Sequence, residues 1–227
     1  MKRADELFAF EERSSSFPHV SSIWSTRSEP EESFISVAIS HWEMVVTRQA
    51  TGTWLTVRGP ETKATTAPIP QDAEFFGIQF SVGSFMRNLR LRHLVDRSLT
   101  LPPATSTSFW LDGSEWEFPR PDNADVFVDR LVRAGLLVHD PVASAALQDE
   151  VAGLSTRAVE RRVARATGLT RGVIRQIRRA EQAVDLLRRG VTAHDVARRA
   201  GYADQPHLTR SLRRFVGQTP SQIAGGS

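Results

Sequence analysis

The chain has 227 residues, of which 40% are hydrophobic and 24% charged, as is typical of a globular protein of one or two domains. It contains no cysteine, which excludes disulfides, thiolate nucleophiles, and iron–sulfur or cysteine-ligated zinc sites. No run of about 18 apolar residues occurs, and the first residues turn acidic at once. We therefore expect neither a transmembrane helix nor a secretory signal, but a cytoplasmic protein without a membrane partner.

Charge is distributed unevenly along the chain. The net charge is +3, and arginine supplies 27 of the 29 basic side chains. Residues 1–140 carry 14 basic and 19 acidic side chains, whereas residues 141–227 carry 15 and 7. Such a difference in sign between two halves predicts that the second half binds a polyanion.

The first half is rich in residues that favour β-strands. Residues 34–46, 53–57 and 74–82 are predicted strands, separated by glycine and proline turn signals. We expect a short helix over residues 85–94. Four prolines within residues 101–121 predict a loop or linker there. This half is therefore expected to be a small β-barrel or sandwich.

Two features of the first half have both a structural and a functional interpretation. His41 and Glu43 are two residues apart in a predicted strand and so face the same side. They would begin a metal site, but such a site needs three or four ligands and no His-x-His pair exists, so we expect a structural role and no metal. All five tryptophans precede residue 120. They would form a core or line an apolar effector pocket, and the core is the favoured interpretation.

The second half shows regularly punctuated helices. Apolar residues recur at helical spacing between polar N-cap residues and closing glycines. The helix over about 171–189 would be roughly 28 Å long at 1.5 Å per residue. The expected N-caps are Asp122-Asn123, Asp140, Ser155 or Thr156, Thr170, Thr192, Asp204 and Thr219, and the expected closing glycines are Gly168, Gly190, Gly201 and Gly217.

An internal repeat relates two of these helices. A shift of 49 residues superposes residues 155–170 on residues 204–219. At 100° per residue, both helices have one apolar face and one face of long hydrogen-bonding side chains. Each follows a shorter helix, which is the helix-turn-helix plan. The matched pairs are Ser155 with Asp204, Val159 with Leu208, Arg161 with Arg210, Val163 with Leu212, Arg165 with Arg214, Gly168 with Gly217, and Thr170 with Thr219.

A duplicated unit of this kind suits double-stranded DNA. B-DNA presents the same groove again about every 34 Å, so a stiff helix over 171–189 would hold two reading helices in successive major grooves. Arginine can hydrogen-bond guanine in a bidentate way, and glutamine can do the same for adenine.

The stretch from Ala197 to Pro220, ARRAGYADQPHLTRSLRRFVGQTP, resembles the signature of AraC/XylS-type transcription regulators. Leu154 to Thr170 resembles the first helix-turn-helix of the same family. The resemblance covers about residues 122–227 and implies a seven-helix, two-unit DNA-binding domain. It also implies a preceding effector or dimerisation domain, here residues 1–121. The expected fold is thus α+β: a small, β-barrel-like (cupin-like) N-terminal domain followed by an all-α double helix-turn-helix domain.

The resemblance also implies which residues contact DNA. Pro206 stands where a polar base reader is frequent, so the second helix is expected to read fewer bases. The implied base-reading residues are Arg157, Glu160 and Arg161 in the first helix, and Gln205, Pro206, Thr209 and Arg210 in the second. Helix N-termini and the remaining arginines are expected to hold phosphates: Ser155, Thr156, Arg165, Thr170, Arg171, Arg213, Arg214 and Thr219.

Three classes of function remain to be separated. The favoured one is a DNA-binding transcription regulator with no cofactor and no catalytic residues. Its expected partners are double-stranded DNA, a small-molecule effector and RNA polymerase, and it would act as a monomer or homodimer. An enzyme with a DNA-targeting tail is the second: a DNA-alkylation repair enzyme would need cysteine, and a metal-dependent cupin enzyme lacks ligands. The third is an interaction protein whose helical half no longer binds DNA.

Overall fold

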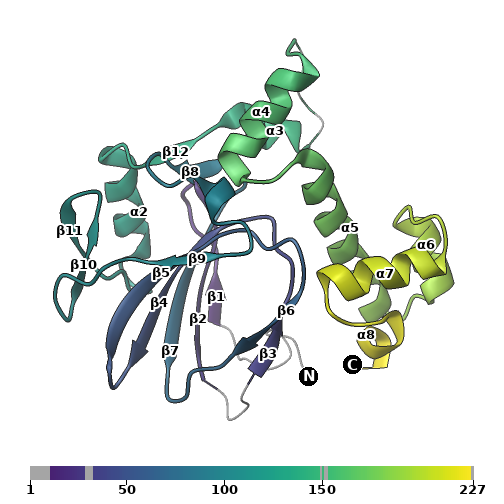
Figure 1. Ribbon diagram of the computed structural model, residues 1–227, viewed down its shortest axis with the longest axis horizontal. Helices are drawn as coiled ribbons and strands as arrows, with labels where there is room; N and C mark the ends of the chain where they lie inside the picture. The colour runs from purple at the N-terminus through teal and green to yellow at the C-terminus, as the bar shows by residue number, and fades with distance from the viewer. Residues whose placement is uncertain (1–10, 29–32, 149, 151–152, 226–227) are drawn as a thin grey trace.

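The computed structural model describes residues 11–28, 33–148, 150 and 153–225. A β-rich N-terminal part and a helical C-terminal part lie side by side, as expected (Figure 1). The main sheet is antiparallel, with strand order β1-β2-β7-β4-β5-β9. Its strands are β1 (Glu11–Arg13), β2 (Val20–Arg27), β7 (Glu74–Phe80), β4 (Glu43–Gln49), β5 (Gly52–Arg58) and β9 (Ser98–Thr100). Among the described strands, β1 and β9 form open edges, so the expected barrel is not closed.

The predicted strand over residues 34–46 is two strands in different sheets. β3 (Ser33–Ser36) pairs with β6 (Thr65–Pro68) in a separate two-stranded ribbon, whereas β4 belongs to the main sheet. The chain turns over residues 37–42, and Trp42 at the end of this turn is buried, stacked on Phe80 with ring centroids 3.9 Å apart. Its indole N–H also donates to the Ser84 carbonyl, at 2.7 Å.

The segment predicted to be a linker is folded. β10 (Ser108–Leu111) and β11 (Ser114–Glu117) form a hairpin, and Phe109 and Trp116 are buried beneath it. The turn is Asp112-Gly113, with φ of 52° and 76°, a dipeptide that favours tight hairpins. The expected helix over 85–94 is also different: β8 (Ser84–Met86) is followed by a 3₁₀ turn, η1 (Leu91–His93).

The helices begin and end close to the predicted positions. Side chains of Asp140, Ser155, Thr170, Thr192 and Asp204 accept backbone N–H groups at the helix starts, as N-caps do. Asn123 is the exception, because its amide oxygen accepts from the preceding Arg120 N–H instead. The helices are α2 (Ala124–Arg133), α3 (Pro141–Ala146), α4 (Thr156–Thr167), α5 (Arg171–Arg188), α6 (Ala193–Arg199), α7 (Gln205–Phe215) and α8 (Pro220–Gly225).

The first of these helices packs with the β-rich part. Phe127 of α2 lies edge-on to Trp116, with ring centroids 6.0 Å apart, and β12 (Leu137–His139) pairs with β8. The division between residues 121 and 122 therefore stays a prediction. Over the described residues, no helix is both long and apolar enough to cross a bilayer.

The C-terminal ends of α4 and α7 are both held against the β-rich part. Gly168 ends α4 with φ 76°, and a β-carbon there would lie 2.8 Å from the carbonyl carbon of Leu91 in η1. At the end of α7, the carbonyl of Phe215 accepts from the Ala38 N–H and that of Arg214 from the Ala64 N–H, both at 2.7 Å. The N-terminal ends of both helices therefore point away from the sheet (Figure 1).

Candidate nucleic-acid interface

The second helix-turn-helix unit consists of α6, a turn at Gly201, and α7. Tyr202 is buried just after the turn, and its hydroxyl lies 3.1 Å from the Ser211 hydroxyl on α7. The Arg179 guanidinium of α5 covers the Tyr202 ring at 4.4 Å and donates to the Gly201 carbonyl at 3.2 Å. These contacts fix the angle between the two helices of the unit.

The outward face of α7 carries the predicted base-reading residues. Gln205, Pro206 and Arg210 are exposed, whereas the opposite face, with Leu208 and Leu212, is fully buried. Thr209 is half-buried, and its hydroxyl donates to the Gln205 carbonyl at 3.0 Å. Three of the four predicted residues thus face solvent together.

The first unit consists of α3, a connection over residues 147–155, and α4. The Asp140 carboxylate caps α3 and accepts from the Arg162 guanidinium of α4 at 2.9 Å. Arg162 is the residue that a 49-residue shift places on Ser211, which contacts Tyr202 in the turn after α6, so the same position holds the second helix of each unit to the segment before it. Burial alone would raise the pKa of Asp140, but Arg162 and the backbone N–H groups of Ala143 and Val142 hold it below its usual value.

The outward face of α4 presents Arg157 and Arg161 to solvent, while Val159 and Val163 are buried opposite. Glu160 is half-buried, and its carboxylate lies 4.0 Å from the Arg171 guanidinium of α5. The two units therefore show equivalent surfaces, each with one buried apolar stripe and exposed hydrogen-bonding side chains.

The predicted phosphate contacts fall into two groups. Arg165, Arg213 and Arg214 are exposed, as is Thr156. Arg171 is half-buried and donates to the Ala146 carbonyl at 3.0 Å, so it also closes the first unit. Ser155 and Thr170 cap helices, and Thr219 does so together with the Gln222 amide, whose oxygen accepts from the Thr219 N–H at 2.8 Å.

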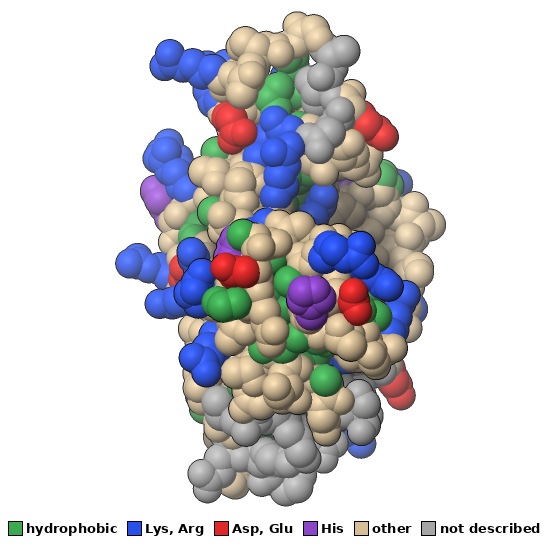
Figure 2. Space-filling view, turned by 90° about the vertical axis from the view of Figure 1, so that its right-hand side faces the viewer, with side chains coloured by type: hydrophobic (Ala, Val, Ile, Leu, Met, Phe, Trp, Pro, Cys, Tyr) green, Lys and Arg blue, Asp and Glu red, His purple; other side chains and the backbone are tan. Residues whose placement is uncertain are grey.

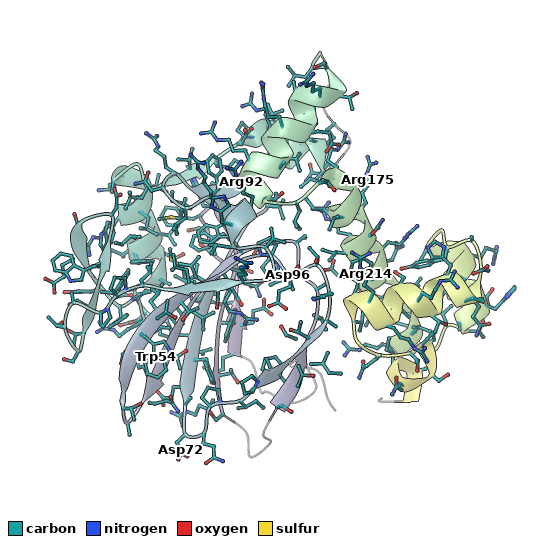
Figure 3. The ribbon with its side chains drawn as sticks, in the orientation of Figure 1. Trp54, Asp72, Arg92, Asp96, Arg175 and Arg214 are labelled. Carbon is teal, nitrogen blue, oxygen red and sulfur yellow. The ribbon has the colours of Figure 1, made fainter. Side chains whose placement is uncertain are left out.

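Helix α5 separates the two units. Its 18 residues span roughly 27 Å, and Figure 3 shows Arg175 on it between α4 and α7. Figure 2 views this helical side face-on. Basic side chains gather along one edge of that view, from the top, where α4 lies, to the middle, where α6 and α7 lie.

Comparison with known proteins agrees with this geometry. Residues 150–225 match a family model described as a helix-turn-helix domain. This segment is a helix-turn-helix domain. The match covers α4 to α8, and therefore both predicted reading helices.

The individual proteins that match have low sequence identity to this chain. The HTH-type transcriptional regulator RipA of Corynebacterium glutamicum is 29% identical over 140 residues, which cover 52% of this chain and 42% of RipA. The chain thus spans less than half the length of the curated relative it matches. Two structures of ToxT from Vibrio cholerae, one bound to (E)-4-(8-methylnaphthalen-1-yl)but-3-enoic acid, are 9% and 10% identical over 96% of this chain and 98% and 99% of theirs. Their TM-score of 0.40 is too low to establish a common fold.

The structure also reveals a cavity that the sequence did not locate. It has a volume of about 630 Å³ and lies between the main sheet and the β3–β6 ribbon. Trp24 and Phe75 of the main sheet line it, as do Phe34 and Ile69 of the ribbon side. Of the five tryptophans, Trp42 and Trp116 are core residues, whereas Trp110 is 45% exposed. Of the five tryptophans, Trp24 is the one that is among the residues lining the cavity.

One wall of the cavity carries a charged cluster. The Arg58 guanidinium lies 3.1 Å from the Glu43 carboxylate and 2.8 Å from that of Glu61, and the Trp24 indole N–H donates to Glu43 at 3.1 Å. Burial alone would lower the pKa of Arg58, but the two carboxylates raise it. Burial also lowers the pKa of His41, which lines the same cavity as Glu43. In the described part of the chain, no three metal-ligating side chains come together.

Proposed function

We propose that the protein is a sequence-specific DNA-binding transcription regulator without catalytic activity. Its AraC-type domain would read two successive major grooves with α4 and α7. The observation that carries this proposal is the matched pair of exposed faces, Arg157 and Arg161 on one helix, Gln205 and Arg210 on the other. Both helices are anchored at their C-terminal ends, which leaves their N-terminal turns free to enter a groove. Contacts with RNA polymerase, a cytoplasmic location, and assembly as a monomer or homodimer stay predictions.

The test begins with selection of bound sequences from a random duplex library. Arg161→Ala and Arg210→Ala are then titrated against the selected duplex. Each is expected to weaken binding by about 1–3 kcal/mol and to relax base preference at one position, the two positions lying about one helical turn apart. Arg133→Ala, which removes an exposed arginine of α2, is the matched control. If Arg161→Ala and Arg210→Ala bind as tightly as this control, the assigned faces are wrong.

We propose further that the cavity holds a small molecule that controls DNA binding. Its volume of about 630 Å³ lies in the range of small-molecule sites. Successive side chains of a strand point to opposite faces. On β3, Phe34 and Ser36 line the cavity, while Ile35 points the other way and lies 2.9 Å from where a β-carbon on Gly217 would be, beside the end of α7. A molecule that moves β3 would therefore move the support of α7.

The charges in the cavity favour one class of ligand. Glu43 and Arg58 line the cavity, and Glu61, which is not among the lining residues, pairs with the same Arg58, so this cluster has a net charge of −1. A lowered pKa favours neutral His41 near pH 7. An apolar molecule with an amine or other hydrogen-bond donor fits this surface better than a carboxylate does. We expect 1-adamantylamine to change the tryptophan fluorescence of the protein at lower concentration than 1-adamantanecarboxylate, this change to be lost in Trp24→Phe, and Glu61→Gln to reduce the difference between the two compounds. Equal binding of the two compounds would contradict this assignment.

A further inference from the structure

A second hollow lies between α4 and the segment that joins β8 to η1. It has a volume of about 560 Å³, and no acidic residue is among the described residues that line it. Five arginines contribute to its walls, two from α4 and three from the β-rich part. We call it the arginine cleft; its basic residues are Arg87, Arg90, Arg92, Arg161 and Arg165.

The five guanidinium groups have no ion-pair partner among the described acidic residues. All five side chains are exposed. Arg165 lies over the Phe85 ring at 5.4 Å, and Arg92 donates to the His93 ring at 3.2 Å, which are contacts with uncharged groups. Arginine does not lose its proton in proteins, so the five charges repel one another until an anion enters the cleft. Three of the five, Arg87, Arg90 and Arg92, belong to the half of the chain that is otherwise acidic.

The cleft is continuous with the surface of α4 that we propose reads DNA. Arg157, Arg161 and Arg165 follow one another at four-residue spacing, so they form one stripe along the helix. Arg161 belongs both to the proposed reading face and to the cleft wall. Because Gly168 fixes the end of α4 on η1, the 87–92 segment stays beside this stripe, and Figure 3 shows Arg92 next to the end of α4. A duplex on α4 would pass over the mouth of the cleft.

We infer that Arg87, Arg90 and Arg92 bind phosphates of the DNA strand beside the groove occupied by α4. The N-terminal half is then part of the DNA interface and not only its regulator. This inference rests on the proposed function. DNA phosphate is favoured over a free anion because the cleft opens onto the reading stripe and shares Arg161 with it. Contacts of this kind add affinity and fix orientation without reading sequence.

The experiment compares two triple variants of the full chain. Arg87→Gln/Arg90→Gln/Arg92→Gln removes the N-terminal side of the cleft. Arg27→Gln/Arg120→Gln/Arg133→Gln removes the same charge from exposed arginines outside it. Binding to the selected duplex is measured by fluorescence anisotropy at several salt concentrations. The log–log slope with salt is expected to fall in magnitude by roughly 0.9 for each phosphate that the cleft variant no longer binds, and to be unchanged in the control.

The outcomes separate this inference from the proposed function. If the parent protein binds duplex and the cleft variant has the slope and affinity of the control, the inference is overturned and the proposed function stands. If the parent binds no duplex, both fail. Inorganic pyrophosphate tests whether the cleft binds a free anion instead of DNA phosphate. The inference is overturned in favour of a small anion if pyrophosphate raises the melting temperature of the parent but not of the cleft variant, while the two proteins have the same salt slope for duplex binding. Because phosphate contacts do not read sequence, we also expect the cleft variant to select the same duplex sequences as the parent.

Discussion

The two helix-turn-helix units have the same plan but are joined internally by different chemistry. In the second unit, a tight turn at Gly201 leads into a buried, uncharged hydrogen bond between Tyr202 and Ser211. In the first, the equivalent position is Arg162, which forms a partly exposed ion pair with Asp140. One unit is therefore held by packing that is insensitive to acid, the other by a charge that acid removes.

The units also differ in what they contact in the β-rich part. Helix α4 ends on the backbone of η1 beside the arginine cleft, whereas α7 ends on residues that flank the β3–β6 ribbon and hence the cavity. The comparison indicates a division of labour. If both proposals hold, the first unit extends its DNA surface through its support, and the second is attached to the candidate ligand site.

The largest expected effect on stability concerns Gly168 and Gly217, the glycines that follow α4 and α7 and lie against the β-rich part. Gly168→Ala adds both left-handed backbone strain and a contact with backbone atoms of Leu91 and Arg92, which cannot move aside. We expect a loss of about 3 kcal/mol in the free energy of unfolding. Gly217→Ala meets the Ile35 side chain, which can shift, so its loss should be smaller, about 2 kcal/mol.

Gly201→Ala is the matched control for both. Gly201 has a similar φ of 72°, but a β-carbon there has no neighbour within 4 Å. It should cost only the strain of the left-handed backbone, about 1 kcal/mol. Denaturant titrations of the three variants give the comparison. A Gly168→Ala protein as stable as Gly201→Ala would mean that α4 does not rest on η1.

A smaller effect separates the two internal joints by pH. The folded-state pKa of Asp140 lies below its ordinary value, so its ion pair stabilises the fold above about pH 3.9 and is lost as the pH falls through the folded-state pKa. Arg162→Gln should therefore cost about 1 kcal/mol near pH 7, and less near pH 3. Tyr202→Phe should cost about 1 kcal/mol at both values.

The same denaturant titrations at the two pH values check this contrast. Tyr202→Phe keeps the aromatic ring, whereas Arg162→Gln shortens the side chain, so the change of each loss with pH, and not its absolute size, reports the chemistry of the joint. If the loss in the free energy of unfolding changes equally with pH in the two variants, the units are not joined by different chemistry.

Much of the helical part could be predicted because its signals are local. Asp140, Thr170 and Asp204 cap helices where the sequence indicated, and the 49-residue repeat located both buried stripes. The strand pairing was harder, because the break over residues 37–42 depends on where distant Phe80 places Trp42. The hairpin has a local signal in Asp112-Gly113, whereas the prediction of a loop or linker over residues 101–121 rested on the four prolines alone.

The candidate sites divide in the same way. The outward faces of α4 and α7 follow from helical periodicity alone. The cavity and the arginine cleft depend on contacts between segments far apart in the chain, such as Arg92 with Gly168. The run Arg87, Arg90, Arg92 was a visible signal, since basic residues cluster there within an acidic half, but nothing local relates it to α4.

The two-sided strand β3 limits how the cavity and α7 can influence each other. A slip of one residue against β6 would turn Ile35 inward and Phe34 outward, exchanging the two surfaces completely. Sliding is therefore too costly to be a graded adjustment. A register slip is therefore not how the proposed ligand would act on α7, and we expect it to displace β3 and β6 together, with their pairing kept.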